Sequence, residues 1–390
     1  MERSKGQILP LILFALAIGG IMLVIMFNVT QKVTDKTISS NAADAAAYSG
    51  GIWTARQLNY MAYTNRAMIA NHVATGHLIA YVSWTRYVES TTSNINQIAR
   101  FIPYLNAVMA ALEQYSTVVR EAAEFSAEVM VPTIDTINRL YALSQYQAQS
   151  DLAPARVESI MRTVVEAHDP VLRFNKTSNL NDSSGSQYRP LIDASIANYK
   201  ARLLGAIEIL SPGEDDGEMS DMVELSYAGS TRWLNNRKWH ETLVPGMFQL
   251  KKEGSTQQKL DTDLAYWQAD DALKFGQWTP KGWSWSTIGW GSADSDEFYD
   301  SYKGIPSYAR KRSEVDEELY IDIVALATKF DDETISRTRM EITSKGTVIS
   351  GYSKARVYFE KPATGFASNA TQYSNLYNPF WKVKLVDPWL

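Results

Sequence analysis

The stretch that decides the fold is Ile8–Phe27, ILPLILFALAIGGIMLVIMF, which contains no charged residue. As a helix rising about 1.5 Å per residue, it matches the roughly 30 Å hydrocarbon core of a bilayer. A cleaved secretory signal has a shorter apolar region that ends in small residues, whereas this one is followed by Asn28-Val29-Thr30-Gln31. We therefore expect a retained transmembrane helix over residues 8–28.

The charges on either side of this span predict its direction. Arg3 and Lys5 lie in a basic leader, residues 1–7, whereas the charges just beyond the span nearly cancel (Lys32, Asp35 and Lys36). Because positive charge favours the cytoplasmic side, we expect the leader in the cytoplasm and the rest of the chain outside it. The sequence therefore predicts a single-pass protein whose first partner is the lipid bilayer.

Length, charge and cysteine content exclude several classes of function. With 390 residues the chain can form two or three domains with cores of their own. Its formal net charge of -5 provides no general attraction for nucleic acid, so we expect no such partner. The absence of cysteine excludes disulfides, cysteine-ligated metals and thiol nucleophiles.

The first half of the chain has the composition of helices. Residues 29–49 lack Pro and Gly and end in an Ala-rich stretch, so the span is expected to continue as one helix, with Gly50-Gly51 bending or ending it. Several more helices are expected, with proline at or near their starts: 52–89, 94–130, 132–148, 154–168 and 187–210.

The second half is rich in Trp, Tyr, Gly and Thr and alternates as strands do. Alternating runs fall at 318–328, 336–344 and 354–360, with turn signals between them at 331–332 and 345–346. The fold class is therefore predicted as α+β, with an antiparallel, Trp-rich C-terminal part. Polar loops at 175–186 and 211–221 are the best boundaries, which gives four expected parts: the leader (1–7), the span (8–28), a helical region (29–212) and an α+β domain (213–390).

A search for catalytic chemistry finds little. His72 and His77 are five residues apart, which puts them on different faces of a helix, and no HExxH, nucleophile elbow or phosphate-binding loop is present. The acidic run Asp294–Asp300 lacks the glycine and terminal glutamate of a calcium loop and is interpreted as a solvated loop. We predict no catalytic residue, no metal and no cofactor. A membrane-tethered enzyme using an unrecognised carboxylate pair remains an alternative.

Tryptophans cluster in Gly276–Gly291, GQWTPKGWSWSTIGWG. Alternation along a strand would put Trp283 and Trp285 on one face. Exposed indoles offer flat surfaces for sugar rings or partner proteins, so these two residues are candidate ligand contacts. The alternative is that the indoles pack a small, loop-rich core.

A second candidate surface is a polar stripe in the helix expected after Gly51. Arg56, Asn59, Tyr63 and Arg66 are spaced three, four and three residues apart, which places them on one helix face. One interpretation is a structural network that satisfies neighbouring polar groups. The other is a contact face for a partner subunit.

The order of motifs at the N-terminus resembles a known family. Gly6-Gln7, the apolar span and then Ser40–Ala47 (SNAADAAA) resemble the TadE/TadG-like proteins of tight-adherence (Flp) pilus systems. Residues 55–68 and 375–381 are similar to segments of longer bacterial members. The resemblance implies a non-enzymatic pilus component, held in the bacterial inner membrane and projecting outward, with other pilin-like subunits as its partners.

One position departs from the family pattern. Family members that are processed are cut after a glycine and carry Glu five residues later, whereas counting from Gly6 leads to Leu11. The resemblance therefore favours a minor pilin-like or anchoring component over a shaft pilin. It leaves open whether the chain is cut after Gly6 and whether it enters the extracellular filament.

Small residues along the N-terminal helix form a candidate helix-packing motif: Gly19, Gly20, Ala42, Ala43, Asp44 and Ala46. Close approach at such residues favours helix association in a bilayer, so we expect lateral packing against similar subunits. The alternative is that the alanines merely favour a helix. For the whole chain, the alternative to a pilus subunit is a membrane-anchored surface adhesin that binds glycan or protein through the Trp-rich region.

Overall fold

The computed structural model describes residues 8–99, 105–176, 188–210, 218–229, 234, 236–261, 264–302, 304–312, 319–330, 348–360 and 374–388. The expected leader, the expected strand at 336–344, both expected turns and most of the two expected boundary loops lie outside these ranges.

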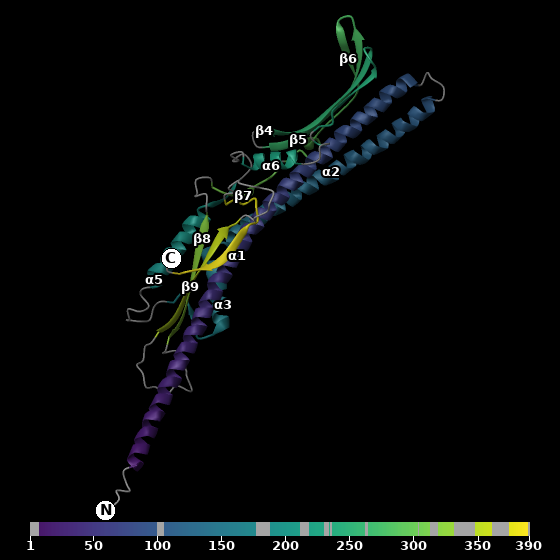
Figure 1. Ribbon diagram of the computed structural model, residues 1–390. Coiled ribbons are helices and arrows are strands. Elements are labelled where there is room, and N and C mark those ends of the chain that lie inside the picture. The colour runs from purple at the N-terminus through teal and green to yellow at the C-terminus, as the bar shows by residue number, and fades with distance from the viewer. Residues whose placement is uncertain are drawn as a thin grey trace, which may run out of the picture. The chain divides into compact units, whose positions relative to one another are not determined.

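The described chain combines helices with antiparallel sheets, which confirms the α+β prediction (Figure 1). The helices are α1 (Ile8–Ala99), α2 (Leu105–Asp151), α3 (Pro154–His168), α5 (Tyr188–Tyr199), α6 (Glu218–Ala228), the short α8 (Ser295–Phe298) and a π-helix, η1 (Lys200–Leu204). The strands are β1 (Arg173–Phe174), β2 (Ile207–Leu210), β3 (Trp239–Val244), β4 (Phe248–Asp261), β5 (Leu264–Thr279), β6 (Gly282–Asp294), β7 (Tyr308–Lys311), β8 (Tyr320–Phe330), β9 (Val348–Phe359) and β10 (Trp381–Val386).

Helix α1 is a single helix of 92 residues that passes through Gly50-Gly51 without ending. A Cβ added at Gly50 would lie 2.8 Å from the Met161 sulfur, and one added at Gly51 would lie 2.7 Å from a methyl of Val383. The two glycines therefore allow α3 and β10 to approach the helix closely. The expectation that the helix ends at this position is wrong, because the missing side chains serve close packing.

Three other helix boundaries differ from the sequence-based expectation. Helix α1 continues to Ala99, past the end expected at residue 89, and α2 begins at Leu105 instead of residue 94. Helix α2 continues through Pro132, where a break was expected. The helix expected over residues 187–210 ends earlier, in η1, and its last residues form β2, which pairs with β7. A partner strand about a hundred residues away along the chain decides this change, and local propensity cannot report it.

The chain divides into two compact units, each made of separate segments. Unit 1 comprises Met1–Tyr60, Ala148–Glu208 and Lys311–Leu390, and unit 2 comprises Met61–Gln147 and Ile209–Arg310. This grouping differs from the expected boundary between residues 212 and 213. An antiparallel sheet needs a cover for its apolar face, and helices from the first half of the chain supply that cover in both units.

Unit 1 is built around a four-stranded antiparallel sheet with the order β1-β8-β9-β10. Val324 and Leu326 of β8 pack on Ile192 of α5. On the other face, a Cβ added at Gly51 of α1 would lie 3.5 Å from the Ala355 methyl of β9. Helices therefore cover both faces of this sheet, which explains why β8 is buried almost throughout.

Unit 2 contains the hairpin formed by the C-terminal part of α1 and most of α2, a meander of strands in the order β3-β4-β5-β6, and the helices α6 and α8. Helix α2 runs alongside the C-terminal part of α1 (Figure 1). Trp267 of β5 is fully buried, and a Cβ added at Gly76 of α1 would lie 2.8 Å from its ring. Next to it, Nδ1 of His72 lies 2.6 Å from the Tyr302 hydroxyl.

Burial lowers the pKa of His72 to about 3. The imidazole is therefore a neutral core group at physiological pH. Among the residues that the structure describes, no group of three or more His, Asp and Glu side chains is arranged to hold a metal ion.

Candidate functional site

The N-terminal part of α1 exposes apolar side chains around its whole circumference. None of its most apolar stretch is buried inside the structure, and the helix is long and apolar enough to cross a membrane. Most side chains from Ile8 to Phe27 are exposed. Each large apolar side chain that is left in water instead of being buried costs about 1.5–3 kcal/mol of free energy. These residues therefore need an apolar surrounding that the other described residues do not supply.

The two parts of the expected helix-packing motif have different environments. A Cβ added at Gly19 or Gly20 meets nothing within 4 Å. Ala42, Ala43 and Ala46, in contrast, have no exposed surface.

The alanines are buried by their own unit, which differs from the expectation that they face another subunit. Gly351 of β9 comes so close to the backbone of Ser39 that no Cβ would fit. Small side chains on this face of α1 let the sheet of unit 1 approach the helix. Asp44, which interrupts the alanines, lies on the exposed side.

The polar stripe does not act as one group of residues. Asn59 is part-buried: its Nδ2 donates to the Trp381 carbonyl over 2.9 Å, and its Oδ1 accepts from the Trp381 amide over 3.0 Å. The side chains of Arg56 and Arg66 are exposed, and Tyr63 is 62% exposed. The structure thus assigns Asn59 to holding the start of β10 and leaves the other three as surface residues.

Asn59 also joins two segments that both resemble segments of the same family. Asn375 accepts from the amides of Tyr377 and Asn378, and its carbonyl accepts from the Trp381 indole over 3.1 Å. The turn so formed presents the Trp381 backbone to Asn59. Asn59, in the segment 55–68, therefore holds the segment 375–381 within unit 1.

The β3–β6 sheet carries an aromatic face. Trp285 pairs with Gly276 and Trp283 with Trp278, and the Trp283 and Trp285 rings stack with centroids 6.1 Å apart. Trp285 is 39% exposed. The two indoles therefore share one face of β6, as the alternation predicts, and Trp285 is available to a ligand.

Charged and polar groups lie beside these rings. The Lys251 ammonium is 6.0 Å from the centroid of Trp285, and the His240 ring meets Trp285 edge-on at 6.2 Å. Glu253 accepts from Lys251 over 2.6 Å and also from Lys274, and these bonds lower the pKa of Glu253 to about 2. The face thus combines flat apolar rings with fixed donors and acceptors.

A hollow of about 690 Å³ adjoins this face. It is lined by Lys238, Trp239, His240, Lys251, Lys252, Glu253, Gly254, Ser255, Asp270, Asp271, Ala272, Trp290 and Gly291. Its volume lies within the usual range for small-molecule sites. Neither Trp239 nor Trp290 was among the candidate contacts named from the sequence, because the pairing of β3 through β6 is what brings them together.

Charged groups buried in the same sheet have a structural role. Asp271 accepts from Arg237 Nη2 over 2.8 Å, from Lys252, and from the Ser83 hydroxyl of α1 over 2.7 Å. The three charged side chains are at most 3% exposed. Burial is the largest influence on Lys252 and lowers its pKa, although the bond to Asp271 opposes this shift. This buried ion cluster ties the sheet to α1.

Comparison with known proteins bears on the N-terminal helix. Residues 6–57 match the family described as putative Flp pilus-assembly TadE/G-like. No curated protein and no solved structure matches the chain. The match covers Gly6-Gln7, the span and the Ala-rich motif, and it confirms the resemblance that these residues predict. The match supports the view that the protein is a component related to Flp pilus assembly. The matched family is not known to include enzymes.

Proposed function

From the premise that residues 6–57 form a TadE/G-like segment, we propose that the chain is a non-enzymatic, membrane-anchored structural or assembly subunit of a tight-adherence (Flp) pilus. One observation carries the proposal. The exposed apolar segment and the buried Ala-rich motif belong to the same uninterrupted helix, α1. A membrane anchor is thereby built directly into a folded unit.

In this proposal the chain crosses the bacterial inner membrane once, with its leader in the cytoplasm and both units in the periplasm. The charges of Arg3 and Lys5 favour that direction. The open surface at Gly19 and Gly20 allows another subunit's transmembrane helix to approach closely. Leu11 in place of the family's glutamate favours an anchoring or minor pilin-like role over a shaft pilin.

The proposal is tested by deleting the chain from the bacterium that encodes it. We expect the amount of shaft pilin sheared from the cells to fall at least tenfold and to be restored by the full chain. A chain that lacks residues 8–28 should not restore it, since it has no anchor. Unchanged sheared pilin after deletion would exclude a role in pilus assembly.

Mass spectrometry of the N-terminus then separates the two possible roles. An intact Met1 confined to inner membranes identifies a fixed anchoring component. A chain that begins at Gln7 in the sheared fraction identifies a processed minor pilin.

A second candidate function, a surface adhesin, is favoured by the aromatic face and its hollow. Trp285 and Trp290 are 39% and 63% exposed, and charged groups lie beside them. Stacking on such rings is a usual way to hold sugar rings. This activity is compatible with a place in a pilus.

If the aromatic face binds glycan, replacing Trp285 and Trp290 with alanine should weaken binding about tenfold or more. Each stacked ring contributes on the order of 1 kcal/mol, and 1.4 kcal/mol corresponds to a tenfold change. The measurement is titration of the full chain in detergent with neutral and acidic oligosaccharides, followed by tryptophan fluorescence. Tyr63→Ala, which removes an exposed ring from α1, is the control and should bind as the unmodified chain does. No binding by the unmodified chain would exclude glycan as the ligand.

A further inference from the structure

One end of the β3–β6 sheet carries two turns side by side. The turn between β3 and β4 meets the turn between β5 and β6 where the Trp278 amide donates to the Met247 carbonyl over 2.9 Å. A Cβ added at Gly246 or Gly282, one in each turn, would meet nothing within 4 Å, so both turns are open to their surroundings. This end of the sheet, which we call the sheet tip, consists of residues 243–248 and 275–285.

The sheet tip exposes large apolar side chains. Leu243, Met247 and Trp278 are 51%, 54% and 53% exposed, and Val244 and Trp285 are exposed as well. A contiguous apolar patch on a protein surface marks a site of interaction with a membrane or with another protein. The arrangement and the composition of the sheet tip distinguish between these two partners.

Apolar side chains project from both faces of the sheet tip. Phe248 pairs with Gln277 and lies on the same face as Phe275, and the two phenyl rings stack with centroids 5.5 Å apart. Trp278 pairs with Trp283, and both lie on the opposite face. A protein partner that packs against one face leaves the other face in water, whereas a bilayer surrounds an inserted element on every side. The distribution over two faces therefore favours a bilayer.

The composition of the sheet tip also fits a lipid surface. Lys281 is its only charged residue, and no Asp or Glu occurs within residues 242–252 or 272–293. Tryptophan favours the boundary between lipid headgroups and acyl chains, because its ring is apolar and its N–H group needs a polar partner. A lysine beside such rings is attracted by anionic headgroups.

The two turns carry few backbone groups that would lack a partner in lipid. Pro245 and Pro280 have no N–H group to satisfy. In the first turn the Met247 amide donates to the carbonyl three residues earlier over 3.0 Å. In the second turn the Gly282 carbonyl accepts from the Thr279 hydroxyl over 2.7 Å. These bonds lower the cost of contact with lipid, where each unsatisfied backbone group is expensive.

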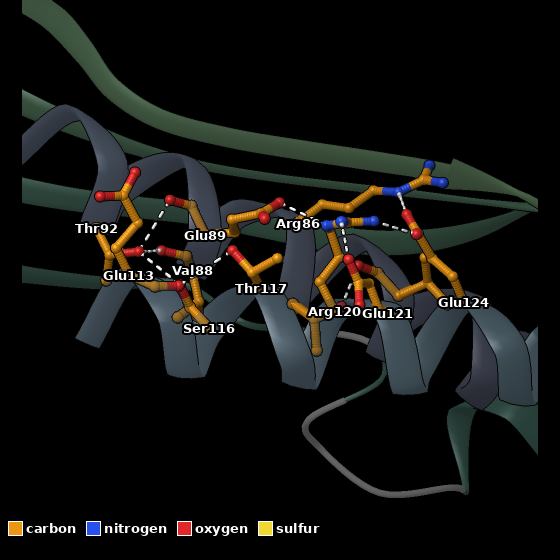
Figure 2. A network of polar contacts seen from close by, with 12 residues as sticks. Arg86, Val88, Glu89, Thr92, Glu113, Ser116, Thr117, Arg120, Glu121 and Glu124 are labelled. Atoms are coloured by element: carbon orange, nitrogen blue, oxygen red, sulfur yellow. Dashed lines mark hydrogen bonds and ion pairs between the residues drawn. The ribbon is translucent and has the colours of Figure 1, made fainter. Parts of the chain in front are cut away.

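Helix α1 holds the part of the sheet that lies away from the tip. The Ser83 hydroxyl donates to the Gly291 carbonyl of β6 over 3.1 Å, and Nη1 of Arg86 donates to the Ser292 carbonyl over 2.7 Å. Figure 2 shows Arg86 joined in turn to Glu124 of α2, at 2.7 Å. The sheet is thus fixed to the pair of helices, and a tip presented from a fixed base loses little conformational freedom on binding.

We propose that the sheet tip inserts into the interface of a lipid bilayer. The indoles of Trp278 and Trp283 lie at the level of the headgroups, and the aliphatic side chains of the first turn reach the acyl chains. The insertion is shallow, because turns are not tolerated deep in the hydrocarbon. This inference goes beyond the proposed function and does not depend on it, since every residue that carries it belongs to unit 2 and the apolar span belongs to unit 1.

A fluorophore at the sheet tip tests the proposal, because the chain contains no cysteine of its own. Met247→Cys in the full chain is labelled with NBD, and the chain is held by its span in lipid nanodiscs and mixed with vesicles of phosphatidylethanolamine and phosphatidylglycerol. Doxyl-labelled lipid is placed in the vesicles in one arm and in the nanodiscs in the other. We expect the NBD emission to fall at least twofold in one arm, which identifies the bilayer that receives the tip. Ala74→Cys, at an exposed position of α1 in the same unit, is the matched control and should keep its emission in both arms.

Charge placed on the sheet tip should prevent insertion. Leu243→Glu with Trp278→Glu, added to the labelled Met247→Cys chain, should abolish the quenching, because a carboxylate is poorly accommodated in apolar surroundings. Tyr63→Glu with Leu225→Glu adds the same charges at two other exposed positions of unit 2 and should leave the quenching unchanged, as should the circular dichroism of all variants. Neither Leu243 nor Trp278 lines the hollow beside the aromatic face, so the result is independent of glycan binding.

Two outcomes overturn the proposal. Emission that stays unquenched in both arms shows that the tip does not enter lipid. Disulfide formation between unlabelled Met247→Cys chains, with the tip unquenched, assigns the sheet tip to a second copy of the chain. Retention of the chain in the nanodiscs reports on the apolar span separately, so either outcome leaves the proposed function intact.

Discussion

Replacing Leu16 and Ile21 together with arginine is expected to release the chain from the membrane. Both residues lie near the middle of the charge-free stretch, and both are exposed on α1. An arginine at the centre of a transmembrane helix costs about 2.5–3.5 kcal/mol on insertion scales, so two cost about 5–7 kcal/mol. After carbonate extraction and centrifugation, the variant should appear in the supernatant and the unmodified chain in the pellet.

The control keeps the two substitutions but moves them out of the span. Thr30→Arg with Thr34→Arg adds the same charge on the same helix, at positions beyond Phe27 whose side chains are exposed. That variant should remain in the pellet. If the Leu16 and Ile21 variant also remains there, then this part of α1 is not the anchor and the proposed function loses its main support.

Replacing Asp271 with asparagine is expected to destabilise unit 2 strongly. The substitution keeps the size of the side chain but leaves Arg237 and Lys252 buried without their counter-ion. Breaking a buried ion pair by removing one partner costs about 3–5 kcal/mol. The midpoint of urea unfolding, followed by circular dichroism of the full chain in detergent, should therefore shift to a markedly lower urea concentration.

A matched control lies on a neighbouring strand of the same sheet. Glu253 also accepts from two lysines, Lys251 and Lys274, but its side chain is about a third exposed (34%). Glu253→Gln should cost no more than about 1 kcal/mol, because solvent screens exposed pairs. If both variants unfold at the same urea concentration, the cluster around Asp271 does not hold the sheet to α1.

Removing one cation as well should recover part of the loss. In the double variant Asp271→Asn, Lys252→Met, only Arg237 of the buried cluster remains charged. In the unmodified chain the Lys252 ammonium lies 4.4 Å from the centroid of the Tyr87 ring, and the methionine keeps an apolar side chain near that ring. We expect its unfolding midpoint to lie above that of Asp271→Asn alone. A lower midpoint would mean that Lys252 contributes through contacts other than its charge pair.

Elements that depend on the pattern of neighbouring residues were predicted correctly from the sequence. The span at Ile8–Phe27 and the strands near 318–328 and 354–360 follow from hydrophobic pattern, and all three are present at or near the expected residues. The helix end expected at Gly50-Gly51 was wrong, because a glycine that serves close packing has the same sequence signal as one that serves a turn.

The candidate sites show the same division. Spacing placed Trp283 and Trp285 on one face, but only the register of β3 through β6 brings Trp239 and Trp290 together in the hollow beside that face. The alanines of the N-terminal motif carry the signal of a helix contact, but they are buried within the chain itself. The ion cluster around Asp271 had no local signal, because its members are separated by up to 188 residues.

The sequence by itself determined the apolar span, the α+β class and the family of residues 6–57, because each depends on a continuous run of neighbouring residues. Only the tertiary structure decided which helices cover which sheet, which polar groups are buried in pairs and which end of the β3–β6 sheet remains open. These depend on contacts between residues far apart in the chain, and the free energy of burying an apolar or charged side chain depends on what the folded chain places beside it.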